Sequence, residues 1–524
     1  MLDRRHVLAG GVALGAAATL GLGSPAHAAD TVTPFGLGVA SGDPLPDGVV
    51  LWTRLVGEDG ALTGRAVQVG WQIAEDERFR RIVQSGTATA RPELAHSVHV
   101  EACGLRPGRE YFYRFRAHGQ LSPVGRTRTA PAAHADPSRL RLGVVNCQDF
   151  QNGYWPAYDA LAAEDLDVVF HLGDYIYEYD AHSRFADRNH SPVATPGLDQ
   201  LRTLEDYRGR HAQYKGDPAL RAAHAAFAWV PTWDDHETEN NYAGTTDEID
   251  DTGAKRQSPE EFARQRAAAY QAYYEHMPIR ARLRPGSSEL RIYRRFDFGR
   301  LARFNVLDTR QYRTDQPGGI PGDFGPEAVG RANTAGSLTG DEQERWLTQG
   351  LRSSPARWNV IAQQVMMSRT RFPNPTGVPP TIVNLDQWDG YAPQRDRLLK
   401  FLADARIANP VVLAGDIHST WFSDLLADFD NPASATVAVE FVATSVSSDF
   451  PVVFDGPIKA LNPLVNPHVR YFDGLARGYL RCELDRDSWR TDVRVVASIE
   501  TRTSPVRTSA SFAVEAGRPG LRQA

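Results

Sequence analysis

Two short polar motifs in this chain each follow an apolar run and carry side chains that can bind a metal ion. Cys147 lies just after the run 140–145, and Asp174 and Tyr177 follow the run 167–170. A thiolate is a metal ligand or a nucleophile, a carboxylate can bridge two cations, and a phenolate is a hard donor that favours ferric iron over zinc. Each also has a plainer interpretation, because Cys147 alone is typical of an inert thiol and Tyr177 of a buried structural tyrosine.

A third motif packs carboxylates, amides and an imidazole into a few positions after the apolar run 227–230. It contains Asp235, His236 and Asn241 within the sequence Asp-Asp-His-Glu-Thr-Glu-Asn-Asn. Oxygen-rich clusters of this kind bind hard cations. A solvated acidic loop is the alternative, and the adjoining apolar run favours a packed site instead.

The fourth motif places Asp416 and His418 two residues apart, after the apolar run 410–413. A carboxylate and an imidazole at the end of a buried strand indicate a metal pair. Open α/β sheets bind their ligands at the carboxyl ends of the strands. We therefore expect the four motifs to meet at such an edge.

The elements that must position these motifs are predicted from residue 138 onward. Apolar strand runs alternate there with helical stretches, which indicates an α/β domain. The stretches 291–308 and 479–496 each contain a turn signal between β-rich runs and predict hairpins, so the sheet is expected to be mixed. A helix is predicted to begin after Ser258, because a proline at the first helical position and Glu261 complete a capping box.

The region before residue 130 has a different sequence pattern, with short β-like runs and no helical stretches between them. Gly, Pro and Asp separate short β-like runs at 49–55, 66–75, 82–90, 96–102 and 111–117. The segment 105–111 ends in Tyr111 and resembles the tyrosine corner of fibronectin type III domains, in which the hydroxyl bonds back to nearby backbone. A small β-sandwich is predicted, and the proline-rich stretch 129–137 is predicted to be the linker.

The order of the motifs resembles that of the calcineurin-like and purple acid phosphatase metallophosphoesterases. Cys147 stands where those enzymes usually carry aspartate or histidine. With this cysteine, the motifs that begin at Gly173, Trp233, Asp308 and Gly415 look like those of the PhoD family of alkaline phosphatases. The resemblance implies an α/β metallophosphoesterase domain at 138–524, with mixed central sheets flanked by helices, preceded by a small fibronectin type III-like β-sandwich at 29–130.

The resemblance also implies two kinds of metal ion. One ferric ion, Fe(3+), is expected to be held by a thiolate, a carboxylate, a phenolate and an imidazole, which map onto Cys147, Asp174, Tyr177 and His418. Calcium, Ca(2+), is expected beside it, with hard oxygen donors that map onto Asp174, Asp235, Asn241 and Asp416.

Two further residues are assigned to catalysis. His236 is expected to serve the phosphate or the leaving group. Arg310 follows the predicted strand at 304–307 and could clamp substrate oxygens, as could Arg313. A structural ion pair is an equally good interpretation of both arginines.

The function expected from this set is hydrolysis of phosphomonoesters, phosphodiesters or both. A hydroxide or oxo nucleophile held on the cations would attack phosphorus while the cations neutralise the phosphate oxygens. The substrate would be a small molecule, a cell-wall polymer or derived from a lipid. Two alternatives stay open: a phospholipase D-like phosphodiesterase acting on phospholipids, and a catalytically inactive exported cell-wall-binding protein.

The amino terminus predicts export. Arg4 and Arg5 precede an uncharged stretch rich in Ala, Gly and Leu, which resembles a twin-arginine signal, and the small residues before Ala29 suit a signal peptidase. Residues 1–28 are thus expected to be removed by the twin-arginine export machinery, giving a secreted extracellular or periplasmic protein without a transmembrane anchor. An uncleaved amino-terminal anchor is the alternative, but so many glycines and alanines would insert weakly.

Composition and charge narrow the field further. Of the 524 residues, 42% are hydrophobic and 23% are charged, which excludes a disordered chain and allows two domains. Loss of residues 1–28 moves the formal net charge from −6 to −7, so no stable nucleic-acid complex is expected. Exported proteins usually pair their cysteines in disulfides, but this chain has only three cysteines. The two besides Cys147, namely Cys103 and Cys482, are predicted to be free buried thiols.

Overall fold

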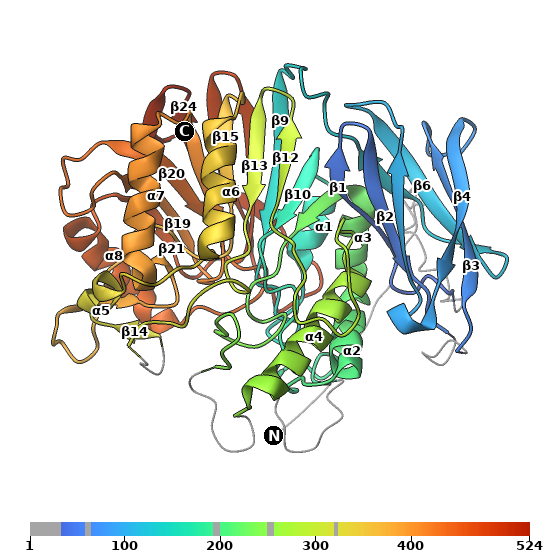
Figure 1. The fold of residues 1–524 in the computed structure, drawn as a ribbon, viewed down its shortest axis with the longest axis horizontal. Helices are drawn as coiled ribbons and strands as arrows, with labels where there is room; N and C mark the ends of the chain where they lie inside the picture. Colours follow the sequence, from blue (N-terminus) through green and yellow to red (C-terminus); the bar gives the residue numbers. More distant parts are fainter. Residues whose placement is uncertain (1–32, 58–63, 192–199, 249–255, 319–322) are drawn as a thin grey trace, which may run out of the picture.

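Two large sheets packed face to face form the centre of the molecule, and helices cover both outer faces (Figure 1). The computed structural model describes residues 33–57, 64–191, 200–248, 256–318 and 323–524. Alternate residues of a strand point to opposite faces. In β10 (Val168–His171), Phe170 packs into the layer between the sheets, where it stacks on Phe304, whereas Val169 packs under the helices.

The larger sheet has ten strands and runs through both regions of the sequence. Strands β9, β10, β11 and β1 are mutually parallel neighbours, and the other pairs are antiparallel. Its order is β25 (Arg518–Gln523), β24 (Val506–Glu515), β23 (Ser488–Val496), β22 (Gly478–Asp485), β9 (Arg139–Val145), β10, β11 (Ala228–Pro231), β1 (Val39–Leu45), β2 (Gly48–Arg54), β5 (Ser97–Cys103).

The second sheet has seven strands, and it is also mixed. Its order is β12 (Arg294–Phe298), β13 (Ala302–Val306), β15 (Trp358–Ala362), β18 (Pro410–Ala414), β20 (Thr436–Val442), β19 (Thr420–Leu426), β21 (Val469–Asp473). The hairpins predicted at 291–308 and 479–496 are confirmed as β12–β13 and β22–β23. The prediction of mixed sheets flanked by helices is therefore confirmed.

The helices divide between the two outer faces. Leucines of α6 (Gly340–Arg352) and α7 (Ala392–Asp404) pack on the seven-stranded sheet. The ten-stranded sheet is covered by α1 (Pro156–Ala162), α2 (Leu204–Lys215), α3 (Pro218–Ala226) and α4 (Pro259–His276). The predicted start of α4 is confirmed, because Ser258 and Glu261 form both hydrogen bonds of a capping box.

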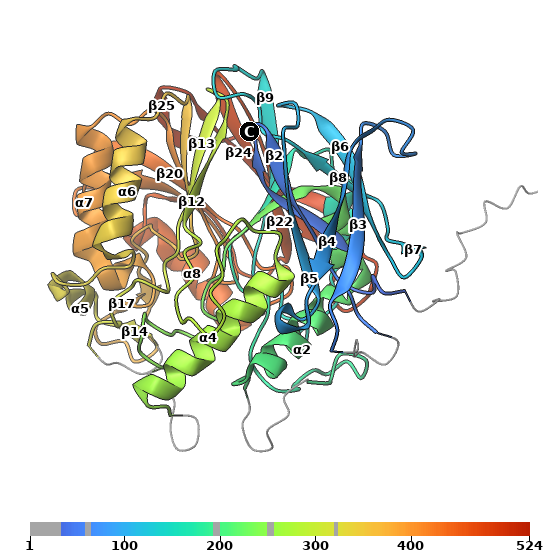
Figure 2. The same ribbon diagram turned by 45° about the vertical axis from the view of Figure 1, so that its right-hand side comes forward.

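The amino-terminal strands do not form a separate body. A five-stranded sheet is built from β4 (Ile82–Ala90), β3 (Val67–Ala74), β6 (Glu110–Ala117), β7 (Gln120–Leu121) and β8 (Gly125–Arg128), and Figure 2 brings it forward. It packs on β2 and β5, which belong to the ten-stranded sheet. A self-contained fibronectin type III-like sandwich is thus not confirmed, because β1 pairs in parallel with β11 and continues the central sheet.

The predicted tyrosine corner is confirmed within this region. The backbone amide of Arg106 donates a hydrogen bond of 3.0 Å to the hydroxyl of Tyr111. The cysteines all lie in the described part of the chain and are free thiols, and Cys482 is buried as expected. Cys103 is exposed, so its predicted burial is wrong: it ends β5 with its side chain turned away from the core.

The predicted export signal at 1–28 lies outside the described residues. Among the described residues, every helix is too short or too polar to cross a bilayer.

Candidate metal centre

The predicted ligands lie in loops that follow the central strands of both sheets. Cys147 follows β9, Asp174 follows β10 and Asp235 follows β11, all in the ten-stranded sheet. These three strands are parallel, so their carboxyl ends share one edge. Asp416 and His418 follow β18 of the facing seven-stranded sheet. The centre therefore lies where the ends of the two sheets meet.

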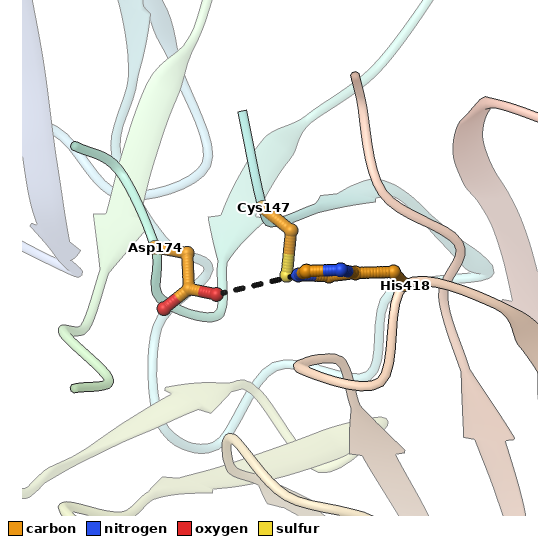
Figure 3. Close-up of side chains that lie close together, drawn as sticks. All are labelled: Cys147, Asp174 and His418. Carbon is orange, nitrogen blue, oxygen red and sulfur yellow. Dashed lines mark ion pairs between the residues drawn. The ribbon is translucent and has the colours of Figure 1, made fainter. Parts of the chain in front are cut away.

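The four residues expected to hold iron are brought together. Ligand atoms of Cys147, Asp174 and His418 all lie within 4.8 Å of one another, and Figure 3 shows the carboxylate and the imidazole pointing toward the thiol. The phenol oxygen of Tyr177 lies 3.1 Å from Asp174 Oδ2 and 3.1 Å from His418 Nε2. One thiol, one carboxylate, one phenol and one imidazole thus face a common point.

Neighbouring groups orient two of these four side chains. His418 Nδ1 lies 2.9 Å from the carbonyl oxygen of Asp449, and a proton on Nδ1 donates to it, which leaves the lone pair of Nε2 directed at the cluster. The hydroxyl of Ser448 lies 2.6 Å from the phenol oxygen of Tyr177. These contacts fix the imidazole and the phenol ring, a common arrangement around metal ligands.

A group of four carboxylates adjoins this set and shares Asp174 with it. Ligand atoms of the four side chains lie within 4.8 Å of one another; we call Asp174, Asp234, Asp235 and Asp416 the acidic cluster. Asp235 and Asp416 are two of the predicted calcium ligands. Asn241 contacts the cluster through its backbone amide, which donates a hydrogen bond of 2.7 Å to Asp235 Oδ2. Its side-chain amide donates a hydrogen bond of 2.5 Å to Asp323.

Arg310 lies fully buried among carboxylates. Its guanidinium pairs with Asp234 at 2.5 Å, Asp386 at 2.8 Å and Asp416 at 3.3 Å. Arg313 pairs with the same Asp386 at 2.5 Å. The structure therefore places both arginines in the ion-pair network that was the alternative to a substrate clamp.

His236 lies between the two parts of the centre. Its ring packs on that of Tyr177, with the centroids 4.1 Å apart, and its Nδ1 lies 2.7 Å from Glu178 Oε2. Burial alone would lower the pKa of His236, but the carboxylates of Glu178, Asp235 and Asp174 outweigh it and hold that pKa well above its usual value. A nitrogen of His236 also lies within 4.8 Å of ligand oxygens of Asp174 and Asp235, so His236 faces the acidic cluster.

Known proteins resemble this chain over nearly its whole length. Residues 142–493 match the family described as PhoD-like phosphatase, and residues 22–131 match its amino-terminal domain, described as PhoD-like phosphatase, N-terminal domain. The chain belongs to the PhoD-like phosphatase family. It is 46% identical to alkaline phosphatase D of Bacillus subtilis (strain 168) over 498 residues, which cover 94% of this chain and 82% of that protein.

A solved structure of PhoD superimposes on this chain with a TM-score of 0.84 and 45% identity, over 94% of this chain and 92% of that one. The matches span nearly the whole chain at an identity high enough to carry the reaction class with the fold. This PhoD-like phosphatase is therefore a hydrolase of phosphoric esters, as its sequence predicts.

The donor set of this PhoD-like phosphatase fits cations. Asp174 Oδ1, Asp234 Oδ2 and Asp235 Oδ1 are buried and have no hydrogen-bond partner among the described residues. Burial, with neighbouring carboxylates, raises the pKa of Asp174 and of Asp234 well above the usual range, and it raises that of Asp416 to about 7. Bound cations reverse such shifts and supply the missing partners.

The thiol and phenol show the same effect of burial. Desolvation, followed by the charge of Asp174, raises the pKa of Cys147 and of Tyr177 well above their usual values. Burial also lowers the pKa of His418 to about 4, so its imidazole is neutral and able to ligate. A thiol and a phenol ligate as anions, which in this site requires a strongly charged cation.

The backbone of the centre is strained. Cys147, Asp174, Asn241, Asp416 and His418 have φ between 52° and 65°, in the left-handed region that side chains other than glycine rarely adopt. These are five of the seven predicted ligands. Left-handed residues cost about 1–3 kcal/mol each and persist where surrounding structure holds them, typically at functional sites.

Sequence reasoning missed several residues of the centre. Asp234 adjoins the predicted Asp235 and belongs to the acidic cluster, so the doubled aspartate was a usable signal. Glu178 directly follows Tyr177 and pairs with His236. Ser448 and Asp386 lie in segments without a metal-type motif, and no local signal points to them.

Proposed function

We propose that this PhoD-like phosphatase is an exported Fe(3+)- and Ca(2+)-dependent hydrolase of phosphomonoesters and phosphodiesters. Iron is assigned to Cys147, Asp174, Tyr177 and His418. Calcium is assigned to hard oxygen donors, namely Asp174, Asp234, Asp235, Asn241 and Asp416. The observation that carries the assignment is the set of three unpartnered buried carboxylate oxygens beside a thiol and a phenol.

The different donors explain why two metals are assigned. Thiolate, phenolate and imidazole suit a transition-metal ion, whereas a group of carboxylate oxygens suits calcium. When bound, the cations neutralise the phosphate oxygens and lower the pKa of the attacking water. Asp174 faces both donor sets and is positioned to bridge them.

The remaining residues have separate roles. His236, held by Glu178, is positioned to contact the phosphate and, in its protonated form, to protonate the leaving oxygen. Arg310 is a positioning residue, because its guanidinium pairs with Asp234 and Asp416 of the acidic cluster and with the neighbouring Asp386, and so fixes these carboxylates around one cation.

The domain division and export route are part of the same proposal. Residues 1–28 are assigned as a twin-arginine signal, so the mature protein begins at Ala29 and acts outside the cytoplasm. Residues 29–130 and 138–524 are assigned to the amino-terminal and catalytic domains. The two family matches support the division, because the first ends at residue 131 and the second begins at residue 142.

The test is hydrolysis of a chromogenic phosphomonoester and phosphodiester by the mature protein, with and without a calcium chelator. Cys147→Ser and Asp174→Asn are compared with the matched control Cys482→Ser, whose buried thiol lies outside the centre. We expect chelation and both site substitutions to abolish hydrolysis, and the control to retain it. Bound iron, measured by elemental analysis, is expected to fall in Cys147→Ser but not in Cys482→Ser.

Two results would contradict the proposal. Full activity of chelated protein would remove calcium from the mechanism. A metal-loaded protein that hydrolyses neither ester would favour the inactive cell-wall-binding alternative.

A further inference from the structure

The candidate metal centre is more open on one side. Side chains of Asp174, Asp234 and Asp235 are at most 2% exposed. Those of Asp416 and His418 are 15% and 24% exposed, respectively. A phosphoester therefore has access to the centre past Asp416 and His418.

A cavity of about 360 Å³ lies against these same two side chains. Its wall is mostly apolar and comes from four separate elements and three loops, including β16 (Phe372–Pro373), β17 (Thr381–Asn384) and α8 (Val452–Val465). The main apolar side chains of the wall are Phe324, Phe372, Ile382, Ile417, Phe450 and Phe454. We call this cavity the apolar pocket.

Core packing holds the wall of the apolar pocket in shape. The ring of Phe372 packs edge-on against Trp421 at 5.8 Å and against Phe324 at 5.3 Å. Phe450 packs against Phe472 at 6.0 Å. Both Phe372 and Phe450 are themselves buried, so the inner wall exists without a ligand. A preformed wall binds an apolar group without an ordering cost.

The mouth of the apolar pocket exposes aromatic surface. Phe324 is 40% exposed and Phe454 is 37% exposed, and they lie on different segments. Large apolar side chains gathered at a concave site mark binding surfaces, whereas single exposed ones are ordinary. Core packing accounts for the buried wall, but it does not account for the two exposed rings beside the centre.

We infer that the apolar pocket binds an alkyl or aryl substituent of the phosphoester while the phosphate lies at the candidate metal centre. The inference rests on the proposed function, because it needs the phosphate at Asp416 and His418. Substituents rich in hydroxyls are disfavoured, since an apolar wall leaves hydroxyls without partners. The pocket thus sets substrate preference by the apolar area next to phosphorus.

Competitive inhibition by alkylphosphonates tests this inference, since each carries only one substituent and is not hydrolysed. Methyl-, butyl- and hexylphosphonate are compared against a soluble chromogenic phosphoester, using the metal-loaded mature protein. We expect the inhibition constant to fall by about threefold per added methylene, or roughly 200-fold over the five methylenes from methyl to hexyl. Equal inhibition by all three would overturn the inference.

Two variants and a control locate the effect. Phe454→Ser and Phe324→Ser are each expected to reduce the ratio of the methyl to hexyl inhibition constants by about tenfold or more. Val453→Ser is the control, because Val453 is 74% exposed on the same helix and does not line the pocket. An unchanged ratio in both phenylalanine variants would also overturn the inference.

Failure of the inference is distinguishable from failure of the proposed function. If methylphosphonate inhibits as strongly as hexylphosphonate, the metal centre binds phosphonate and only the pocket assignment is wrong. If the metal-loaded protein hydrolyses no ester, the proposed function itself is wrong.

The alkyl chain could belong to a soluble ester or to a lipid in a membrane, and sedimentation with phosphatidylcholine vesicles separates the two. Val452 and Val453 are 70% and 74% exposed at the start of α8, beside the pocket mouth. Cosedimentation that the double substitution of these valines by serine removes would assign the chain to a membrane lipid. Absence of cosedimentation, with chain-length dependence retained, would assign it to a soluble ester.

Discussion

The segment 171–177 supplies side chains to two buried polar clusters of opposite character. Asp174 and Tyr177 face the candidate metal centre. His171 and Tyr175 face a second cluster, which we call the basic cluster and which consists of His171, His211, Lys215, His224 and His276. Neighbouring residues of one short segment thus face buried clusters of opposite charge type, one acidic and one basic.

The basic cluster avoids charge by losing protons. Lys215 Nζ lies 3.3 Å from His224 Nε2, and the hydroxyl of Tyr175 lies 2.8 Å from the same nitrogen. Burial lowers the pKa of Lys215 well below its usual value and that of His171 to about 3. His276 is held neutral, since Arg54 donates to Nε2 at 2.6 Å and Nδ1 donates to a backbone carbonyl.

Burial also disfavours charge in the acidic cluster, since it raises the pKa of Asp174, Asp234 and Asp416. Three of its carboxylates pair with Arg310, and three of its oxygens lack partners among the described residues. Its backbone is strained, whereas none of the five residues of the basic cluster has positive φ. Burial and missing partners alone do not identify a metal site, because buried nitrogens of His171, His211 and His224 also lack partners among the described residues. The metal site is distinguished by unpartnered carboxylate oxygens that converge beside a thiol.

Substitution of adjacent residues in this segment gives the largest expected contrast. Asp174→Asn is expected to lower kcat by about 1000-fold, because Asp174 belongs to every group of potential ligands found in the described residues. Tyr175→Phe is expected to keep kcat within about threefold and to lower the free energy of unfolding by about 1 kcal/mol. Steady-state kinetics and urea unfolding measure the two. Similar losses of kcat in both variants would contradict the conclusion that only the acidic cluster takes part in catalysis.

Removal of the buried amine tests the basic cluster by a gain in stability. Lys215→Met is expected to raise the free energy of unfolding at pH 7 by an amount on the order of 1 kcal/mol, because burial disfavours the ammonium and methionine fills a similar volume without needing a polar partner. The gain is expected to shrink toward pH 10, where the unfolded lysine also loses its proton. Urea unfolding at both pH values measures this. Destabilisation of equal size at both values would contradict it.

Acid sensitivity is the next expected effect. Burial lowers the pKa of His211 well below its usual value, so below about pH 6.5 the unfolded chain takes up a proton that the folded chain does not. Stability contributed by neutral His211 is complete above that pH and is lost as pH falls. His211→Leu is expected to reduce the slope of unfolding free energy against pH by about 1.4 kcal/mol per unit between pH 6.5 and 5.

The control for this measurement is His118→Leu, because His118 is exposed and solvated in both states. It is expected to leave the slope unchanged. A slope that does not change in His211→Leu would show that His211 is protonated in the folded protein.

Backbone strain gives the smallest contrast and is isolated by paired substitutions in chelated protein. His418 has a φ of 55°, where glycine is expected to be more stable than alanine by about 1 kcal/mol. His224 lies in α3, where glycine is expected to be less stable than alanine by about the same amount. Each pair lacks the imidazole, so the difference in melting temperature reports the backbone alone. Differences of the same sign would contradict the assigned strain.

Much of this architecture was predictable because local rules determine it. Cys147, Asp174, Asp235, Asp416 and His418 all follow apolar strand runs, and the ends of parallel strands share an edge. Hairpins and the capping box of α4 likewise depend on nearby residues.

The remaining features depend on contacts between distant segments. Parallel pairing of β1 with β11 joins residues such as Ser41 and Ala228, and nothing in either run specifies the partner. Which of Asp234 and Asp235 turns toward Arg310 depends on the loop conformation. Ser448 reaches Tyr177 only because the two sheets meet.

The strained backbone at the ligand positions predicts how the sequence would change in relatives that lose the activity. At positions 147, 174, 416 and 418 the backbone has positive φ, which glycine adopts without the steric cost that other residues meet. A lineage that no longer needed the reaction would gain stability from glycine at these sites. We therefore expect relatives of this protein that have lost catalysis to carry glycine at these four positions.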